Sequence, residues 1–333
     1  MMFGRLTVAL SAAALLTLTA CGGDPLEEEP SPDSDAGASS ENDPTSDGTE
    51  TSDGTEEKGA LTISGQSFTE AVVMAEMYEQ VLDGAGYDVT TKLVETRDVY
   101  VQQMSDGKVD VVPDYLAGMA DYLNTLENGE DAEPITSNDA AASLEALKPL
   151  ADAAGITMLE PSGATSQNAF FVTQDFAEEN SVSTLSDLAE VGPVKLAAAP
   201  DCVGRDDCEK GLKEVYGIDI TEVVPLGYGS AQTKDAVISG EVEVGQTGTT
   251  DGTLEAQELV LLEDDQGIQP AQNLVPAVNT EFLSDNPDVE EVLNELSATL
   301  TTEDLGQLNA QVDVERMEAS EVAQTYLEDK GLI

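Results

Sequence analysis

The chain has 333 residues, with 13 Lys and Arg against 67 Asp and Glu, no His, and a formal net charge of −54 at pH 7. Nucleic acid and anionic lipid head groups carry charge of the same sign, so the composition makes both poor partners. The absence of His removes the commonest neutral metal ligand and the commonest general base. The chain also has no phosphate-binding glycine loop and no Gly-x-Ser-x-Gly motif. We therefore expect no enzymatic activity, no cofactor and no metal.

One acidic run, Glu263-Asp264-Asp265, contains the oxygen ligands that Ca²⁺ prefers. The run lacks the ligand spacing of an EF-hand loop. A solvated turn is therefore the expected structure at these residues.

The first 20 residues have the pattern of a secretory signal peptide. Arg5 precedes an apolar stretch over residues 6–20, which is shorter than the ~20 apolar residues needed to span a bilayer. The run Leu18-Thr19-Ala20-Cys21 resembles a bacterial lipobox, in which the signal is cut before the Cys and that Cys is lipidated. The alternative is an ordinary signal with an incidental Cys. The lipobox interpretation places the mature protein on the extracytoplasmic face of the cell membrane.

Residues 21–60 have the composition of an acidic tether. They are dominated by Asp, Glu, Ser, Thr, Gly and Pro, and Leu26 is their only large apolar residue. Such a segment cannot bury enough apolar surface to offset its ordering entropy, so we predict disorder.

From residue 61 onward, segments with strand patterns alternate with segments of helical periodicity. Strands are expected at residues 61–64, 87–94, 109–112, 156–159, 169–173, 194–198, 220–224, 242–245, 259–262 and 274–278. Helices are expected at residues 68–82, 99–104, from 114, 138–153, 184–191, 204–216, 231–239 and from 288. The alternation predicts an α/β fold of parallel sheets covered by helices, with a ligand site at the carboxyl ends of the strands.

Cys202 and Cys208 are the only other cysteines. Outside the cytoplasm an even pair predicts a disulfide, which would close a short loop around Arg205. The alternative is two free thiols.

Four motifs in chain order carry a family resemblance. They are Ser64-Gly65-Gln66-Ser67-Phe68-Thr69-Glu70; Glu95-Thr96-Arg97 with Pro113-Asp114-Tyr115; Ala199-Pro200-Asp201 with Arg205; and Thr250-Asp251-Gly252. The chain resembles the substrate-binding proteins of ABC importers for glycine betaine, choline and related osmoprotectants. This resemblance implies a two-lobed, type II periplasmic-binding-protein-like fold with the ligand in the cleft. Lobe 1 would comprise residues 61–165 plus 273–333, and lobe 2 residues 166–272.

The resemblance also implies substrate-binding residues. Tyr115 matches an aromatic wall that would hold a quaternary ammonium group by cation–π attraction, although ordinary packing at a helix start is the alternative. Arg205 matches a family Arg that would pair with a ligand carboxylate, or would form a surface salt bridge. Gln66 and Ser67 would contact the ligand, or would simply cap a helix.

The chain departs from the family pattern in lobe 2. A second cage Tyr is missing, since Gln167 and Asn168 occupy its segment, and Gly248 stands where an aromatic residue is common. Tyr228 could compensate for these missing aromatic residues. Gln167, Asn168 and Thr249 would hydrogen-bond a more polar ligand, and Thr250 and Asp251 complete the expected set.

The expected function is capture of a small zwitterionic or quaternary-ammonium osmoprotectant by a monomer. The solute would pass to the transmembrane subunits of an ABC permease, and the lipid anchor would be the only membrane contact. The alternative is a sensory or scaffold lipoprotein with the same fold and a degenerate or different cleft.

The acidic excess continues through the folded region and resembles the surfaces of proteins from salt-loving organisms. The alternative is a merely acidic exported protein.

We expect the melting temperature to rise steeply between low and molar NaCl. The Debye length is ~30 Å at 0.01 M and ~3 Å at 1 M, so salt confines the repulsion to near neighbours. Calorimetric melting in a chloride series measures the effect. Sulfate is less suitable because it also strengthens apolar burial. A melting temperature that stays flat across the series would contradict salt adaptation.

Overall fold

The computed structural model describes residues 58–129 and 132–333. The expected signal peptide, Cys21 and nearly all of the expected tether lie outside the described residues. Within the described part, no helix is both long enough and apolar enough to cross a membrane. The first strand begins at Gly59, two residues before the expected start of the folded region.

Five strands form the first sheet. They are β1 (Gly59–Ile63), β2 (Tyr87–Thr91), β3 (Val111–Tyr115), β4 (Ile156–Met158) and β10 (Leu274–Asn279). The strand order is β2-β1-β3-β10-β4, with β1 parallel to both of its neighbours. All five residues of β3 are buried, as expected for a central strand covered on both faces.

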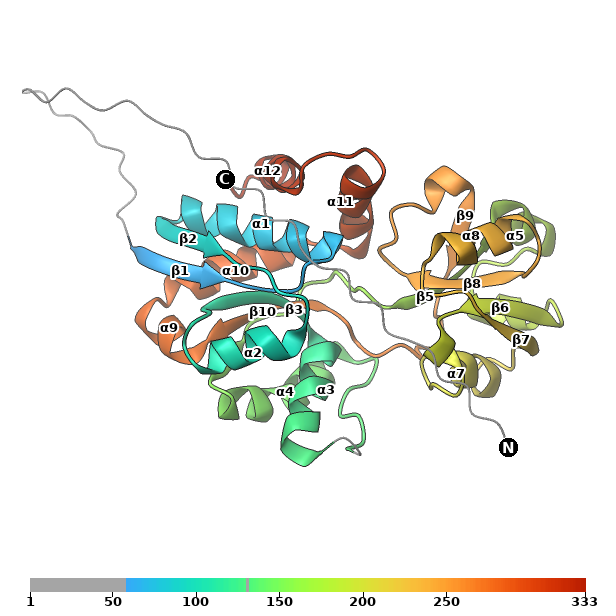
Figure 1. The fold of residues 1–333 in the computed structure, drawn as a ribbon, viewed down its shortest axis with the longest axis horizontal. Coiled ribbons are helices and arrows are strands. Elements are labelled where there is room, and N and C mark those ends of the chain that lie inside the picture. Colours follow the sequence, from blue (N-terminus) through green and yellow to red (C-terminus); the bar gives the residue numbers. More distant parts are fainter. Residues whose placement is uncertain (1–57, 130–131) are drawn as a thin grey trace, which may run out of the picture. The chain divides into compact units, whose positions relative to one another are not determined.

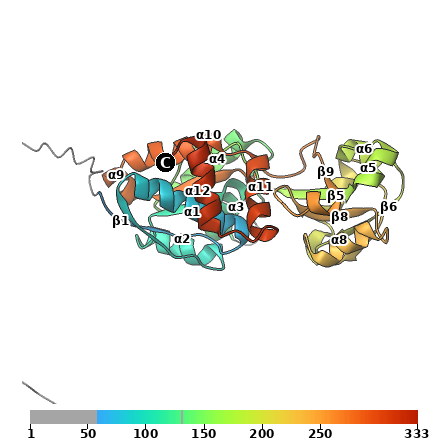
Figure 2. The same ribbon diagram turned by 90° about the horizontal axis from the view of Figure 1, so that it is seen from above.

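Helices cover both faces of this sheet (Figure 1). One apolar cluster packs the sheet against α1 (Thr69–Gly84), α10 (Asp288–Thr299), α11 (Thr302–Asp313) and α12 (Ala319–Lys330). The other packs it against α2 (Arg97–Ser105), α3 (Leu116–Asn128) and α4 (Ala140–Ala153). A short helix, α9 (Thr280–Asp285), follows β10. Figure 2 shows α12 beside α1, so the C-terminal tail is part of the same layer as the first helix.

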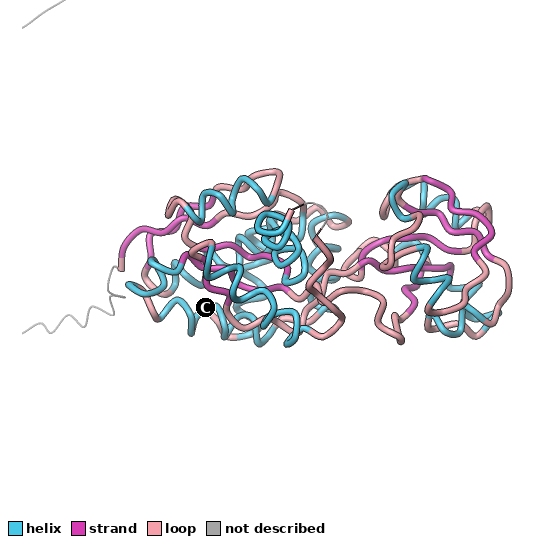
Figure 3. Tube along the Cα trace, turned by 90° about the horizontal axis from the view of Figure 1, so that it is seen from below, coloured by secondary structure: helices cyan, strands magenta, loops and turns pink. Residues whose placement is uncertain are grey.

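The second sheet has the order β7-β6-β8-β5-β9. Its strands are β5 (Asn168–Thr173), β6 (Val194–Ala198), β7 (Ile220–Pro225), β8 (Val244–Gly248) and β9 (Leu259–Leu262). Its helices are α5 (Gln174–Asn180), α6 (Leu185–Ala189), α7 (Glu209–Glu214) and α8 (Ala231–Ile238), with 3₁₀ turns at Pro200–Cys202 and Glu255–Gln257. Here too the strands lie between helices (Figure 3). The mixed α/β fold of two lobes therefore matches the fold class that the sequence predicted.

The prediction of purely parallel sheets is wrong, because each sheet contains one strand of opposite direction. β10 runs antiparallel to β3 and β4, and β5 runs antiparallel to β8 and β9. Each of these two strands is the first that the chain forms after crossing from the other sheet. The parallel strands β3 and β8 end at the edge of their sheet where the chain crosses between the sheets. A strand that begins at this edge, as β5 and β10 do, must run antiparallel to them.

The two crossing segments pair with each other. Ser166 N donates to Gln272 O at 3.0 Å, and Leu274 N donates to Ala164 O at 3.0 Å. Thr165 and Asn273 form an isolated antiparallel bridge between these bonds. Any change in the angle between the two sheets must therefore bend two hydrogen-bonded segments together.

Two expected helices begin later than predicted. Asp114 lies in β3, where its buried carboxylate is paired, and the helix starts at Leu116. The helix expected over residues 204–216 covers only Glu209–Glu214. A disulfide joins Cys202 to Cys208, and Gly204 has a φ of 83°, which a right-handed helix does not allow.

Candidate ligand-binding site

A cavity of about 620 Å³ is lined by residues from both sheets. Three aromatic side chains line it: Phe68, Tyr115 and Tyr228. Its charged lining consists of three carboxylates and two cations: Glu70, Asp251, Asp313, Arg97 and Lys234. The cavity lies where β3 and β8 end, as expected for a ligand site in such sheets.

Two of the aromatic rings come from the first lobe. Phe68 precedes α1 and Tyr115 is the last residue of β3, and their rings stack with centroids 6.1 Å apart. Tyr115 is buried, whereas Phe68 is 45% exposed. The pair therefore offers a fixed inner face and an accessible outer face for a ligand.

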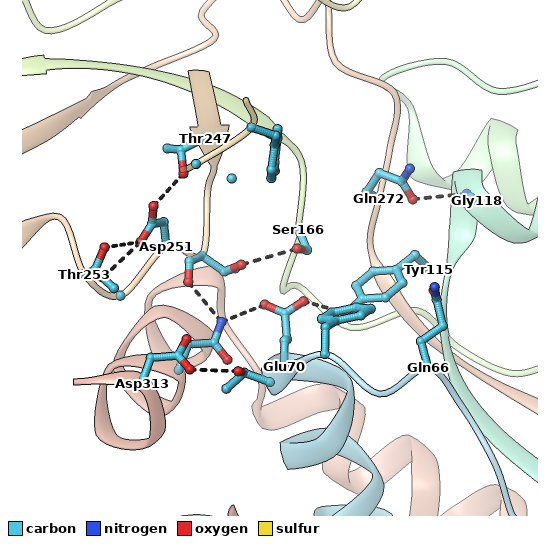
Figure 4. A pocket seen from close by; sticks show the side chains of 18 of the residues that line it. Gln66, Glu70, Tyr115, Gly118, Ser166, Thr247, Asp251, Thr253, Gln272 and Asp313 are labelled. Atoms are coloured by element: carbon cyan, nitrogen blue, oxygen red, sulfur yellow. Dashed lines mark hydrogen bonds between the residues drawn. The ribbon is translucent and has the colours of Figure 1, made fainter. Parts of the chain in front are cut away.

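Glu70, in the first turn of α1, connects the aromatic wall to the rest of the site. The Tyr115 hydroxyl donates to Glu70 Oε1 at 2.6 Å (Figure 4). Asn309 Nδ2 donates to Glu70 Oε2 at 3.0 Å and to the Thr250 carbonyl at 2.9 Å. Burial, and next the Glu70 charge, hold the pKa of Tyr115 well above its usual value, so the hydroxyl remains a donor.

Arg97 lines the cavity but is already paired. Its Nη2 lies 2.8 Å from Asp114 Oδ1, and the Tyr100 hydroxyl donates to Asp114 Oδ2 at 2.7 Å. Burial opposes the charge of Arg97, but the Asp114 carboxylate outweighs it and raises the Arg97 pKa. Gly118 makes room for the guanidinium, because a Cβ at this position would lie 2.6 Å from Arg97 Nη2.

The second lobe contributes a buried ion pair. Lys234 Nζ lies 2.6 Å from Asp251 Oδ2 and donates to Thr253 Oγ1 at 2.6 Å. The Thr247 hydroxyl also donates to Asp251 (Figure 4). Burial opposes ionisation of Asp251, but the hydrogen bonds from Lys234, Thr247 and Thr253 lower its pKa below the ordinary value.

Half of the site residues predicted from the sequence line this cavity: Gln66, Tyr115, Tyr228, Thr250 and Asp251. Tyr228 is 50% exposed, and a Cβ at Gly248 would lie 2.7 Å from its hydroxyl. Tyr228 thus covers the space beside Gly248.

The other five predicted residues lie elsewhere, and the side chains of four of them form local hydrogen bonds or ion pairs. Gln167 Nε2 donates to the Pro270 carbonyl at 2.8 Å, and the Thr249 hydroxyl donates to the Thr165 carbonyl at 3.0 Å. Both therefore satisfy backbone groups of the crossing segments. Ser67 is exposed and is not among the residues that line the cavity.

Arg205 and Asn168 meet at Asp207 instead of at the cavity. Arg205 pairs with Asp201 at 2.9 Å and with Asp207 at 2.5 Å, and Asn168 Nδ2 donates to Asp207 Oδ2 at 2.8 Å. The expectation that Arg205 faces a ligand together with Tyr115 is therefore not supported by its placement. The surface salt bridge, the other possibility for Arg205, is what the structure contains.

Sequence reasoning missed the four polar side chains that organise the cavity: Glu70, Arg97, Lys234 and Asn309. Glu70 and Arg97 stand within the motifs that carry the family resemblance, which is the signal that could have found them. Lys234 and Asn309 lie on helices with no such motif, and only the fold brings them to the cavity.

Asp264, in the acidic run, organises a turn. It accepts the backbone N–H groups of Gly267 and Ile268 at 3.1 Å and that of Gln269 at 2.9 Å, and Tyr216 donates to it. Within residues 58–129 and 132–333, no group of three or more Cys, Asp or Glu residues is arranged to hold a metal ion.

We expect Lys234→Met to lower the free energy of unfolding by about 3–5 kcal/mol, because it leaves the Asp251 charge buried and unpaired. The depressed pKa of Asp251 means that its ionised form stabilises the parent protein above the unfolded pKa of ~3.9, and that this stabilisation is lost as the pH falls through the folded pKa. The difference in unfolding free energy between the parent and Lys234→Met should therefore be largest near pH 7 and shrink below about pH 4. Urea unfolding at several pH values measures it.

Lys195→Met is the matched control, since the Lys195–Glu222 pair is exposed and should contribute less than about 1 kcal/mol. Equal losses in the two variants would contradict the importance of the buried pair.

Comparison with known proteins agrees with this arrangement. The family described as the substrate-binding domain of an ABC-type glycine betaine transport system matches residues 59–329. The chain is 28% identical to the glycine betaine-binding protein YehZ of Escherichia coli over 274 residues, 79% of this chain and 88% of that protein. It is 27% identical to a glycine-betaine-binding protein of Pseudomonas aeruginosa over 285 residues, 82% of this chain and 88% of that protein.

A solved structure shares the fold. Apo YehZ of Escherichia coli superposes with a TM-score of 0.71 at 28% identity, covering 82% of this chain and 99% of that chain. The fold is that of type II periplasmic binding proteins. Because the family match spans nearly all described residues, the chain belongs to the substrate-binding family of ABC-type glycine betaine transport systems, which binds solutes and is not a family of enzymes.

Proposed function

We propose that this protein is the extracytoplasmic solute-binding lipoprotein of an ABC importer. It captures a small quaternary-ammonium or zwitterionic osmoprotectant in the cavity between its lobes and delivers it to the permease. The observation that carries this proposal is the aromatic lining of that cavity by Phe68, Tyr115 and Tyr228.

The chemistry of the solute explains why aromatic rings are needed. A quaternary ammonium group has no N–H to donate, so it is held by the negative faces of aromatic rings. Phe68 and Tyr115 supply two faces from the first lobe and Tyr228 a third from the second. A ligand that touches all three rings joins the lobes, which favours a closed state.

Closure would bend the paired crossing segments. They contain Thr165 and Asn273 and are the only covalent connections between the two sheets within the described chain. Rotation about two adjacent segments is the hinge motion by which such two-lobed proteins close on ligand. The ligand's differential affinity for the closed state would drive it.

Calorimetric titration with glycine betaine, choline, carnitine, ectoine and proline tests the proposal. We expect at least one quaternary ammonium solute to bind. Tyr115→Leu or Tyr228→Ala should weaken that binding by about 0.5–2 kcal/mol, the scale of one cation–π contact. Tyr228 is half exposed, so its variant should fold normally.

Tyr122→Ala is the control, because Tyr122 lies on α3 and is not among the cavity residues. No binding across the whole panel would favour the sensory or scaffold alternative with a degenerate cleft.

Membrane attachment through Cys21 is the second part of the proposal. Each buried CH₂ of an acyl chain contributes about 0.8 kcal/mol, so a multiply acylated Cys holds a folded domain at a membrane. Cys21→Ala should move the protein from the membrane fraction to the soluble fraction, and mass spectrometry should find the parent N-terminus acylated at Cys21. An unmodified Cys21 would contradict the anchor.

A further inference from the structure

Glu70 is a buried carboxylate in an aromatic cavity, and none of the ion pairs among the described residues includes it. Its exposed fraction is 4%, and its two hydrogen-bond donors, Tyr115 and Asn309, are both uncharged. Hydrogen bonds from neutral donors stabilise a buried carboxylate but leave its charge unbalanced, so a cation that approaches it is attracted. In a ligand-binding cavity, that cation can be the ligand.

Both cationic side chains that line the cavity already pair with acids of the protein. Arg97 is bound to Asp114 at 2.8 Å and Lys234 to Asp251 at 2.6 Å. Both acids of these pairs are themselves buried or nearly so. A ligand carboxylate would have to share Arg97 or Lys234 with the acid that already binds it, whereas a ligand ammonium group beside Glu70 would compete with no cation of the described chain.

Asn309, which binds Glu70, has a hydrogen-bond acceptor that the described part of the chain leaves unsatisfied. Its Nδ2 donates to two acceptors, Glu70 and the Thr250 carbonyl, which fixes the orientation of the amide. Its Oδ1 is buried and has no hydrogen-bond partner among the described residues. The residue that binds the Glu70 carboxylate thus also has an acceptor unsatisfied within the described chain, the negative end of its neutral amide dipole.

We propose that Glu70 is the counter-ion of the ligand's ammonium group and that the site therefore selects net cations of the choline type over zwitterionic betaines. This inference rests on the proposed function and specifies the charge class of its solute.

Glu70 acts partly through Tyr115. A phenol that donates to a carboxylate carries more electron density on its ring, which strengthens the attraction of the ring face for a cation. The carboxylate also attracts the ammonium group directly, in surroundings where burial limits screening. For a betaine, the same charge attracts the ammonium end and repels the carboxylate end.

Titration of choline and of glycine betaine at one fixed NaCl concentration tests the proposal, because both carry the same trimethylammonium group. We expect the parent to bind choline at least about 10-fold more tightly, as for one close charge contact. Glu70→Gln should weaken choline binding about 10-fold and glycine betaine binding less, so that the preference nearly disappears. Tyr115→Phe keeps the ring and the Glu70 charge but cuts the hydrogen bond, and should reduce the preference partially.

Glu79→Gln is the matched control. Glu79 lies on the same helix, accepts from Thr91 at 2.5 Å and is not among the cavity residues. The Glu79→Gln substitution removes the same charge from the protein and should leave the preference for choline over glycine betaine unchanged. Melting curves without ligand verify that each variant is folded.

Two results would overturn the inference while the proposed function stands. One is a parent that binds glycine betaine as tightly as choline. The other is a Glu70→Gln variant, folded by its melting curve, that keeps the parent's preference. Failure of the parent to bind any solute in the panel would overturn the proposed function and this inference together.

Discussion

A single buried carboxylate, Glu70, ties the site to the fold. It stands in the first turn of α1, where the helix N-terminus favours negative charge. Its partners are 45 and 239 residues away in sequence, at the end of β3 and on α11. Asn309 extends the connection to the Thr250 carbonyl, which lies two residues beyond β8 in the second lobe. The aromatic wall of the cavity is therefore positioned by contacts between segments that lie far apart in sequence.

The acidic composition determines what the cations can do. Ten of the 12 basic residues in the described part form an ion pair: Lys58, Arg97, Lys108, Lys148, Lys195, Arg205, Lys210, Lys213, Lys234 and Lys330. Most of these pairs are exposed and contribute little individually to stability. Each pair nevertheless gives its cation an acidic partner within the protein. In such a chain a cation at a ligand site must be isolated from neighbouring acids, and neither Arg97 nor Lys234 is isolated.

The same abundance of acids accounts for the local pairing of Arg205. The resemblance implied a ligand carboxylate as the partner of Arg205, but abundance of acids makes local pairing the default, and Asp201 and Asp207 are within four residues. The polar residues of the crossing segments are also engaged locally. Gln167 and Thr249 are polar near a ligand cleft, yet the backbone groups of Pro270 and Thr165 use them first.

The fold itself was largely accessible from the sequence. The sequence patterns predicted a segment for every strand. Buried strands such as β3 and β10 are short apolar runs, and the helices between strands have apolar residues at helical spacing. Strand direction was not accessible in this way. The direction of β5 and β10 depends on which sheet the chain has just left, and local periodicity contains no such information. The motifs located Tyr115 but could not show that Asn309, near the other end of the chain, would complete its surroundings.

High salt and electrostatic selection of a ligand are compatible in this structure. Salt screens charges that face the solvent, and the exposed acids are the groups whose repulsion it relieves. Buried and partly buried charges are screened much less. Glu70 is 4% exposed, so its attraction for a cation persists under conditions in which surface repulsion is suppressed. An acidic protein can therefore use salt to stabilise its surface while one buried carboxylate, left without a protein cation, sets the charge of what it binds.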